Sequence, residues 1–400
     1  MPPVAEAITF AQSERGSIMS RTKRRNQNQI KNTTTPPHNN NQNSLSAPNG
    51  ALQLPAEIAQ RLAYGEAVVA NISDGAGQST PVTAAQFGHY IKDHYTRFEH
   101  RWGKLFLEYQ RQHVMADVMS KLKAGMDELS CEYLEQQDRM ILRAYLGGNT
   151  LFPKDSLWTN EDRRIIELNR QKVEQGQPPF LKQVNLEWSS SYTNVYGMYD
   201  LPPAVLQRVN GKAIIDGGGF IGDTLVLFRD LFPQSVKYSF EPSQRNYDYM
   251  CNMLKTDIDN GSLKAFCQAL GSHDGTFRLS IPNAGMYNSA ASGYYDWEQQ
   301  GRYEEVPMVT IDEVVAEHQL EVGLIKLDVE GVEPDIIQGA LTTIKEQKPL
   351  LVIAFYHQPE EFYELKPFLE SLNLGYKFRV RRSCISSPLG EFVLIAYQDD

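Results

Sequence analysis

Carboxylates stand next to glycines in two short stretches of the chain, and each stretch follows an apolar run. The first stretch is Asp216-Gly-Gly-Gly-Phe-Ile-Gly222, directly after the apolar residues 213–215. The second contains Asp328 and Glu330, at the end of the run 324–329. A strand that ends in a glycine turn before a helix lets a ligand approach the main chain, because glycine accepts positive φ and the helix presents free N–H groups. A binding site for a small polar ligand is therefore predicted.

Two classes of ligand use a glycine loop of this kind. Gly217, Gly219 and Gly222 spell G-x-G-x-x-G. Glu241 follows nineteen residues after the last glycine, as in dinucleotide folds where the acid binds the ribose. Asp216 argues against a dinucleotide, because its carboxylate would lie beside the pyrophosphate at a cost on the order of 1 kcal/mol or more. The same carboxylate suits S-adenosylmethionine, which carries an ammonium and a sulfonium but no phosphate.

S-adenosylmethionine is therefore the predicted cofactor, with a nicotinamide-dependent oxidoreductase as the alternative. Asp216 is expected to hold the ammonium group, and Glu241 to accept hydrogen bonds from the ribose. A glycine loop that only turns a strand into a helix is the structural alternative. The loop residues expected to approach the cofactor are Gly217, Gly218, Gly219, Phe220 and Gly222.

Three further residues are expected near the same ligand because they stand at the ends of predicted strands. Gln268 and Ala269, at the end of the third strand, are candidates for the adenine side. Asp328 should face the same crevice as Asp216 and Glu241, because ligands bind beyond the carboxyl ends of parallel strands. Acids at three strand ends favour one shared site.

Proton transfer is assigned to two residues. His357 follows the apolar strand 350–356 directly, and an imidazole with a reference pKa near 6.5 suits a general base acting on a hydroxyl. Glu330 is the second candidate. The alternative is that Glu330 is a solvated acid in a loop with no role in catalysis. A divalent ion held by Asp328, Glu330 and His357 is the less favoured alternative, and the expectation is a reaction without metal.

The second half of the chain alternates strand and helix, which predicts a mainly parallel sheet. The loop 282–303 is rich in Asn, Gly, Ser and Tyr and suits a mobile cover. The last two strands are expected to pair antiparallel. Strands are expected at 213–215, 236–240, 263–269, 276–281, 324–329, 350–356, 376–381 and 392–397, and helices at 242–255, 311–319 and 359–372.

The stretch 196–397 resembles the FkbM family of S-adenosylmethionine-dependent methyltransferases. The resemblance rests on residues 215–223, on 325–333 followed by Gly339-Ala340, and on Tyr356-His357. It implies an α/β fold with a Rossmann-like class I methyltransferase sheet, mostly parallel with an antiparallel last strand. It also implies O-methylation, often of a sugar or a secondary-metabolite hydroxyl. A module that binds the cofactor without catalysis is a further alternative.

Three regions are expected along the chain. Residues 1–50 are polar and of low complexity, so a disordered tail is predicted. Residues 51–195 show helical periodicity over 87–126, 128–146 and 160–175, which predicts a helical region of unassigned role. The methyltransferase domain is expected at 196–400. Residues 192–206 are predicted to link the helical region to this domain, and two tyrosines of the link, Tyr196 and Tyr199, could reach over the ligand.

Composition limits the function classes. The net charge of −10 argues against a nucleic-acid partner, and a small-molecule or sugar acceptor is expected instead. The four cysteines have no spacing that indicates a zinc site or a disulfide framework. Because no secretory signal and no apolar run of about 18 residues is present, a cytoplasmic protein without a membrane span is expected.

Overall fold

The structure, a computed structural model, describes residues 103–146, 157–176, 189–281, 302–385 and 390–399, together with six short strands between 7 and 153. The chain forms two compact units. One consists of Met1–Glu99 with Gly147–Leu157, and the other of His100–Leu146 with Trp158–Asp400. From residue 100 on, most of the predicted helical region therefore belongs to the same unit as the predicted methyltransferase domain. The division into 1–50, 51–195 and 196–400 stays a prediction.

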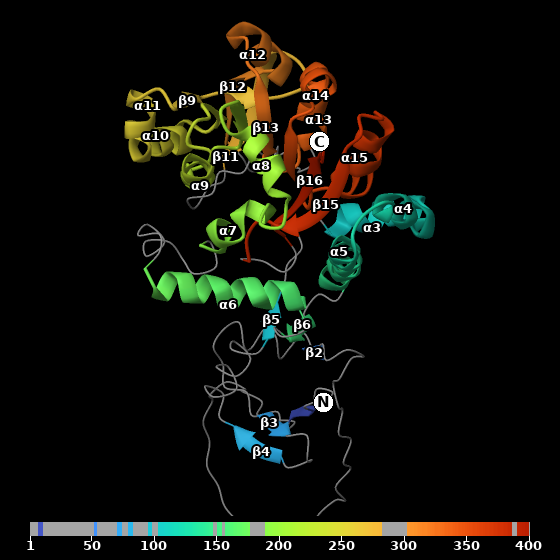
Figure 1. Ribbon diagram of the computed structural model, residues 1–400. Coiled ribbons are helices and arrows are strands. Elements are labelled where there is room, and N and C mark those ends of the chain that lie inside the picture. Colours follow the sequence, from blue (N-terminus) through green and yellow to red (C-terminus); the bar gives the residue numbers. More distant parts are fainter. Residues whose placement is uncertain are drawn as a thin grey trace, which may run out of the picture. The chain divides into compact units, whose positions relative to one another are not determined.

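A seven-stranded sheet forms the centre of the second unit (Figure 1). The strand order reverses between β7 and β13, which is where open α/β sheets bind ligands. All neighbouring strands are parallel except at β16, which is antiparallel to both β14 and β15, so the predicted fold class is confirmed. In spatial order the strands are β15 (Lys377–Arg382), β16 (Phe392–Tyr397), β14 (Leu350–Ala354), β13 (Val322–Leu327), β7 (Ala213–Gly217), β8 (Lys237–Phe240) and β9 (Leu263–Phe266).

The central strands alternate their side chains between two buried cores, one on each face of the sheet. Ile214, Leu324 and Val352 lie in one core, with residues of α8 and α9. Ile215 and Ile325 lie in the other, with residues of α3–α5 and α12–α15. Because helices cover both faces, these strands read as continuous apolar runs, which made them easy to predict.

The helices of this unit follow the predicted ranges closely in several places. Glu128–Leu146 is one helix as predicted, and Thr159 caps α6 by accepting from the N–H of Asp162. The helices are α3 (Gly103–Gln112), α4 (Met115–Lys123), α5 (Glu128–Leu146), α6 (Asn160–Glu174), α7 (Ser190–Thr193), α8 (Pro203–Val209), α9 (Asp223–Leu231), α10 (Gln244–Met253), α11 (Lys255–Asp259), α12 (Ile311–His318), α13 (Glu333–Gln338), α14 (Leu341–Gln347) and α15 (Pro359–Ser371), with a 3-10 turn, η3, at Val195–Gly197.

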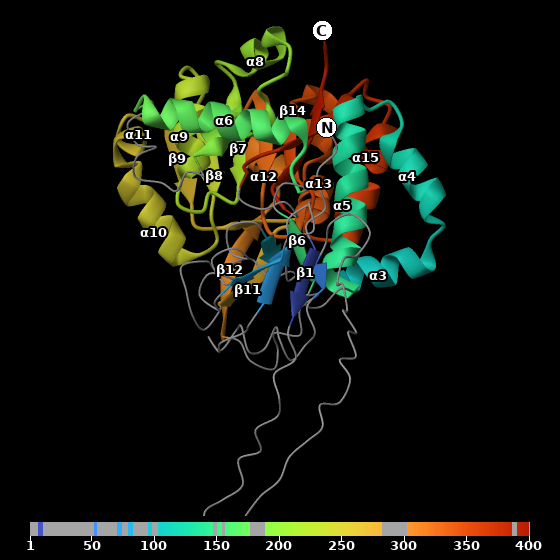
Figure 2. The ribbon, with the colours of Figure 1, turned by 90° about the horizontal axis from the view of Figure 1, so that it is seen from below.

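Helices α3–α5 pack beside α15 and β15 at the sheet edge (Figure 2). The ring centroids of Phe106 and Phe362 lie 5.9 Å apart, and the rings of Tyr109 and Tyr363 stack at 4.9 Å. Arg381 Nη2 lies 2.7 Å from Asp127 Oδ2. These contacts extend the main core, so α3–α5 and the seven-stranded sheet belong to one compact unit.

Several predicted boundaries were wrong. The expected strand 263–269 is divided into β9 and β10 (Ala269–Leu270), and β10 belongs to a second sheet with β12 (Arg302–Val309) and β11 (Gly275–Ile281). Strand β12 was not predicted, because its charged Glu304 and Glu305 interrupt the apolar pattern. The residues expected to form a link at 192–206 include α7, η3 and α8. The rest of the predicted loop, 282–301, lies outside the described residues.

The first unit contains two antiparallel three-stranded sheets, ordered β1-β3-β4 and β2-β6-β5. Strand β5 contradicts the helix expected across 87–126, and β1 lies within the predicted tail, most of which lies outside the described residues. Their bounds are β1 (Ala7–Phe10), β2 (Leu52–Gln53), β3 (Ala70–Ser73), β4 (Ser79–Val82), β5 (Tyr95–Arg97) and β6 (Thr150–Pro153).

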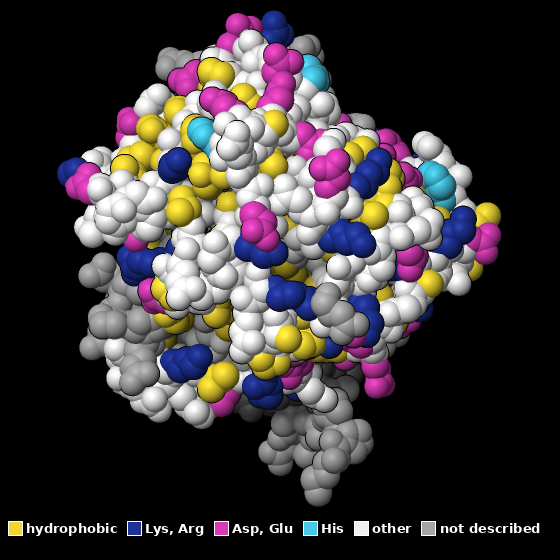
Figure 3. All heavy atoms as spheres, turned by 45° about the horizontal axis from the view of Figure 1, so that its top comes forward, with side chains coloured by type: hydrophobic (Ala, Val, Ile, Leu, Met, Phe, Trp, Pro, Cys, Tyr) yellow, Lys and Arg dark blue, Asp and Glu magenta, His cyan; other side chains and the backbone are white. Residues whose placement is uncertain are grey.

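The described surface carries charges of both signs. On the face shown in Figure 3, Lys and Arg side chains are interspersed with Asp and Glu. None of the helices in the described ranges combines the length and the apolar character that crossing a membrane requires.

Candidate active site

A cavity opens beyond the carboxyl ends of β7, β8 and β13, where the strand order reverses. Gly218 and Phe220 reach it from the loop after β7, Glu241 from the end of β8, and Asp328 from the end of β13. Five carboxylates and one ammonium group line the cavity. The carboxylates are Asp223, Glu241, Asp328, Glu330 and Glu391, and the ammonium belongs to Lys326.

The glycine loop is held tightly between the neighbouring strands. The N–H of Gly218 donates to the carbonyl of Phe240 at 2.9 Å, and its φ is +79°. A Cβ at Gly218 would lie 1.9 Å from the carbonyl oxygen of Asp328, and one at Gly219 would lie 2.4 Å from Ser239 Oγ. Gly218 and Phe220 line the cavity as predicted, whereas Gly217, Gly219 and Gly222 are not among its lining residues.

Asp216 lies behind the cavity wall and is not among the lining residues. It is fully buried, with Oδ1 3.0 Å from Lys326 Nζ and Oδ2 accepting from Ser239 Oγ at 2.6 Å. This placement therefore does not favour a direct contact between Asp216 and the ammonium group of a cofactor. The carboxylate instead neutralises a buried lysine.

Lys326 is a site residue that the sequence did not reveal. Its Nζ donates to the carbonyls of Gly217 and Gly218, at 3.2 and 2.8 Å, and it lines the cavity. Burial alone would lower the pKa of Lys326. The carboxylates of Asp216 and Asp328 outweigh this effect and raise the pKa of Lys326 above its usual value. The charged Lys326 thus holds the glycine loop in place through hydrogen bonds to its carbonyl groups. The only feature of the sequence that could have indicated this role is the presence of a lysine within an otherwise apolar strand.

Glu241 lies at the cavity as predicted. Its Oε2 accepts from the N–H of Phe220 at 2.8 Å, and its Oε1 accepts from the N–H of Ser243 at 2.9 Å. Burial raises the pKa of Glu241 to about 7, and these two N–H groups limit the rise. Oε1 also accepts from Asn246 Nδ2 at 3.4 Å, so it is Oε2 that retains a lone pair able to accept a ligand hydroxyl.

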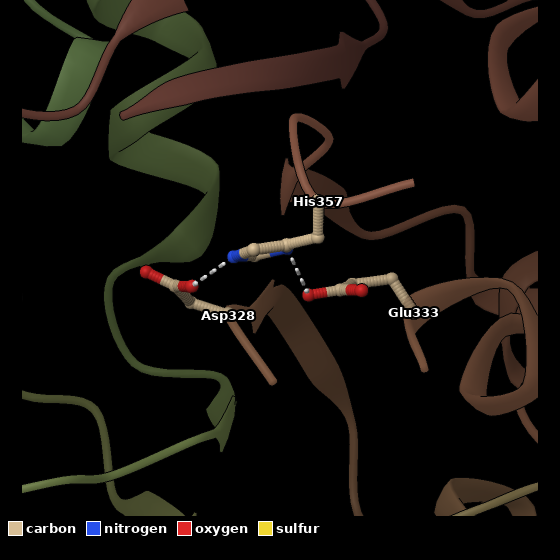
Figure 4. A group of neighbouring side chains, drawn as sticks. All are labelled: Asp328, Glu333 and His357. Atoms are coloured by element: carbon tan, nitrogen blue, oxygen red, sulfur yellow. Dashed lines mark ion pairs between the residues drawn. The ribbon is translucent and has the colours of Figure 1, made fainter. Parts of the chain in front are cut away.

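His357 lies between the carboxylates of Asp328 and Glu333 (Figure 4), and two further carboxylates are within 4 Å of its ring nitrogens. Its Nε2 lies 3.9 Å from Asp328 Oδ1 and 3.8 Å from Glu330 Oε2. Its Nδ1 lies 3.4 Å from Glu333 Oε1 and 3.5 Å from Glu361 Oε1. The structure thus brings the two predicted catalytic residues together, along with Asp328, and adds two acids that the sequence did not assign.

This surrounding does not favour His357 as a general base. The side chain is 1% exposed and is not among the lining residues. Burial alone would lower the pKa of His357. The carboxylates of Glu333 and Glu361 outweigh this effect and raise the pKa of His357 well above its usual value. An imidazole that is already protonated near neutral pH cannot accept a proton from an acceptor hydroxyl.

The carboxylates at the end of β13 are better exposed to the cavity. The Asp328 side chain is 25% exposed and accepts from the hydroxyl of Tyr196 at 2.8 Å. The Glu330 side chain is 34% exposed, and its backbone has a φ of +63°. Tyr196 lines the cavity as considered from the sequence, whereas Tyr199 is not among the lining residues.

The predicted adenine residues lie elsewhere. Neither Gln268 nor Ala269 is among the lining residues, and Ala269 instead pairs with Met308 in the second sheet. Pro242 and Leu279 line the cavity in their place. The reason is the early end of β9 at Phe266, which takes the following residues away from the main sheet.

The strand order, the antiparallel β16 and the acid-lined cavity at the switch point define a class I methyltransferase domain. Residues 216–378 match the sequence model of the methyltransferase FkbM domain. These residues thus form an FkbM domain, of the S-adenosylmethionine-dependent methyltransferase family. No curated protein matches the chain.

Several solved structures are similar to this chain. Methyltransferase FkbM from Methylobacillus flagellatus KT is 17% identical, with a TM-score of 0.38, over 57% of this chain and 60% of that chain. A methyltransferase from Geobacter sulfurreducens is 12% identical, with a TM-score of 0.32, over 62% of this chain and 94% of that one. Aeropyrum pernix fibrillarin with natively bound S-adenosyl-L-methionine is 13% identical, with a TM-score of 0.30, over 52% and 73%. The match to the first of these spans less than two thirds of its length.

Proposed function

We propose that the chain uses S-adenosylmethionine to methylate a hydroxyl group of a small molecule or sugar. The charge of the cavity carries this proposal, because five lining carboxylates face one ammonium, Lys326, which is paired with Asp216. A pyrophosphate would be repelled there, whereas a ligand with an ammonium and a sulfonium would be attracted. The FkbM domain at 216–378 supports the same cofactor. The negative charge also disfavours a nucleic-acid acceptor, whose phosphates need basic partners.

The residues that would hold the cofactor fit its groups. Gly218 has no Cβ, so its loop can pack against the carbonyl oxygen of Asp328, and both residues line the cavity where the cofactor would bind. Glu241 would accept a ribose hydroxyl with the lone pair of Oε2 that Phe220 leaves open. Asp216 would act indirectly, by holding Lys326 under the loop. S-adenosylmethionine, when bound, supplies an electrophilic methyl group.

Proton removal from the acceptor is assigned to Glu330. It lines the cavity and is about one third exposed, so an acceptor hydroxyl can reach it. Its Oε2 lies 3.8 Å from Nε2 of His357, so the Glu330 carboxylate has a positively charged neighbour that can hold it in place. His357 thus becomes a positioning residue in this proposal, and Glu330, the second candidate from the sequence, becomes the first.

Cofactor identity is tested by calorimetric titration with S-adenosylhomocysteine and NAD in parallel. S-adenosylhomocysteine is expected to bind and NAD is not. Glu241→Gln should weaken binding about tenfold or more, because hydrogen bonds to a charged group contribute about 1.5–3 kcal/mol. Glu317→Gln, on the exposed side of α12, is the matched control and should bind like the wild type. Tighter binding of NAD, or no binding of either ligand by the folded protein, would contradict the proposal.

Cofactor binding should also depend on pH through Glu241. Ribose hydroxyls donate to the ionised carboxylate, so binding favours the deprotonated form. With a pKa of about 7, Glu241 is mostly protonated at pH 6 and mostly ionised at pH 8. The affinity for S-adenosylhomocysteine is therefore expected to rise roughly tenfold between these values. In the Glu241→Gln variant this rise in affinity with pH should disappear. If the variant kept the same pH dependence, a group other than Glu241 would be responsible for it.

A further inference from the structure

We propose that Tyr196 positions the carboxylate of Asp328 to bind the ammonium group of the cofactor. The sequence assigned this ammonium group to Asp216, which is buried in an ion pair with Lys326 and is not among the cavity's lining residues. Tyr196 and Asp328 both line the cavity. The inference rests on the function proposed above, because it concerns the binding of S-adenosylmethionine. It adds a residue that lies outside the range 216–378 matched by the FkbM domain.

The main chain of Asp328 is fixed to the glycine loop, where the ammonium group is expected. Its N–H donates to the carbonyl of Gly217 at 3.1 Å, and its own carbonyl oxygen packs closely against Gly218. The Asp328 side chain is 25% exposed, so a ligand in the cavity can reach it. Asp223 also stands next to the loop, but it occupies the first turn of α9, where the helix dipole and free N–H groups stabilise an acid. Asp328 is therefore the better placed partner for an ammonium group.

The hydroxyl of Tyr196 holds one oxygen of this carboxylate. It donates to Asp328 Oδ2 at 2.8 Å, while Oδ1 lies 3.9 Å from Nε2 of His357. Burial and the charge of Asp328 raise the pKa of Tyr196 well above its usual value, so the hydroxyl keeps its proton and remains a donor. The carboxylate is thus held at one oxygen and faces a positively charged ring at the other. Its remaining lone pairs can accept from a ligand.

Three successive residues at the turn η3 have positive φ. The values are +55° at Val195, +52° at Tyr196 and +84° at Gly197. This region is unfavourable for residues with a Cβ, above all for β-branched and bulky ones. Such conformations persist where surrounding contacts impose them, and they concentrate at ligand sites. Here the unfavourable turn carries the residue whose hydroxyl reaches Asp328.

Contacts with the last two strands hold this turn in place. Asn194 Nδ2 donates to the carbonyl of Arg382 at 2.7 Å, and a Cβ at Gly197 would lie 2.8 Å from Val393 Cγ2. The ring of Tyr196 is buried in the core that contains residues of α8 and α9. A phenylalanine would fill this core as well, whereas a buried hydroxyl requires a hydrogen-bond partner. The core therefore accounts for the ring but not for the hydroxyl.

The test is calorimetric titration of the full chain with two ligands. S-adenosylhomocysteine carries the ammonium group, whereas 5′-methylthioadenosine has the same adenosine and a thioether but no amino-acid group. Tyr196→Phe is expected to weaken binding of S-adenosylhomocysteine about fivefold, and Asp328→Ala about tenfold or more. Binding of 5′-methylthioadenosine should change less than about twofold in either variant, because it lacks the group that Asp328 would bind. A purely structural role of Tyr196 would weaken binding of both ligands.

Tyr192→Phe is the matched control for the lost hydroxyl. The Tyr192 hydroxyl also donates to a carboxylate, Asp230 Oδ2, at 2.7 Å, but Tyr192 is not among the lining residues. This variant should bind both ligands like the wild type. The double variant Tyr196→Phe with Asp328→Ala should bind S-adenosylhomocysteine no more weakly than Asp328→Ala alone, because the hydroxyl acts only through the carboxylate.

Three results would overturn the inference while the wild type still binds S-adenosylhomocysteine. The first is unchanged binding of this ligand by Tyr196→Phe or by Asp328→Ala. The second is equal weakening of both ligands by Tyr196→Phe. The third is a double variant whose loss equals the product of the two single losses. In each of these cases the proposed function stands. If the folded wild type bound neither ligand, the proposed function would fall and this inference with it.

Discussion

Replacement of Lys326 by Met is expected to lower the free energy of unfolding by about 3–5 kcal/mol, the usual effect of removing one partner of a buried ion pair. Met has nearly the length of the lysine stem, so little space is left empty. Asp216, however, stays fully buried with its charge opposed by no ammonium. The carbonyls of Gly217 and Gly218 also lose a donor. Urea unfolding followed by circular dichroism measures the change.

Two companion variants make this expectation specific. Lys237 in β8 is equally buried, but its Nζ donates to the carbonyls of Phe232 and Ser235. Lys237→Met should therefore cost less, about 1–3 kcal/mol for unsatisfied carbonyls. The double variant Asp216→Asn with Lys326→Met removes both charges and should recover much of the loss. Equal losses in Lys326→Met and Lys237→Met, with no recovery in the double variant, would show that the ion pair is not responsible.

The carboxyl ends of the strands were the part of the site most readily predicted. Glu241 and Asp328 lie at the cavity because parallel strands end at one edge of a sheet, and this follows from the order of strands and helices alone. Asp216 was expected beside them for the same reason. Its side chain instead pairs with Lys326, one strand away. The face to which a residue at a strand end points depends on the register between strands, which the sequence does not show.

The surroundings of His357 could be predicted only in part. Its place after β14 was evident, but the acids around it come from 328–333 and from α15, segments that only the fold brings together. Glu361 stands four residues after His357 in the first turn of α15, and this spacing was a usable signal. The change from base to positioning residue follows from burial and charge, which depend on tertiary contacts.

Short elements with mixed composition were the main failures in the fold. Strand β12 carries the adjacent charged residues Glu304 and Glu305 before its apolar residues 306–309, and it is stabilised by its pairing with β11. The turn η3 places Val195 and Tyr196 at positive φ, which no β-branched or aromatic residue would suggest. Tertiary contacts compensate for this conformation: the Tyr196 hydroxyl donates to Asp328, and its ring lies in a buried core.

Replacement of Gly218 by Ala is expected to cost about 3 kcal/mol or more and to abolish binding of S-adenosylhomocysteine. A φ of +79° costs an L-residue about 1–2 kcal/mol. The added Cβ would also lie 1.9 Å from the carbonyl oxygen of Asp328, so the loop and the end of β13 must separate, at a further cost of about 1–3 kcal/mol. That separation would displace Gly218 and Asp328, which both line the cavity.

Gly261→Ala isolates the first of these two costs. Gly261 has a φ of +78°, and a Cβ there would meet nothing within 4 Å. This variant should therefore lose only about 1–2 kcal/mol and bind S-adenosylhomocysteine like the wild type. Urea unfolding and calorimetry on both variants give the comparison. If Gly218→Ala lost no more stability than Gly261→Ala and still bound the ligand, the close contact between the glycine loop and β13 would have no part in shaping the cofactor site.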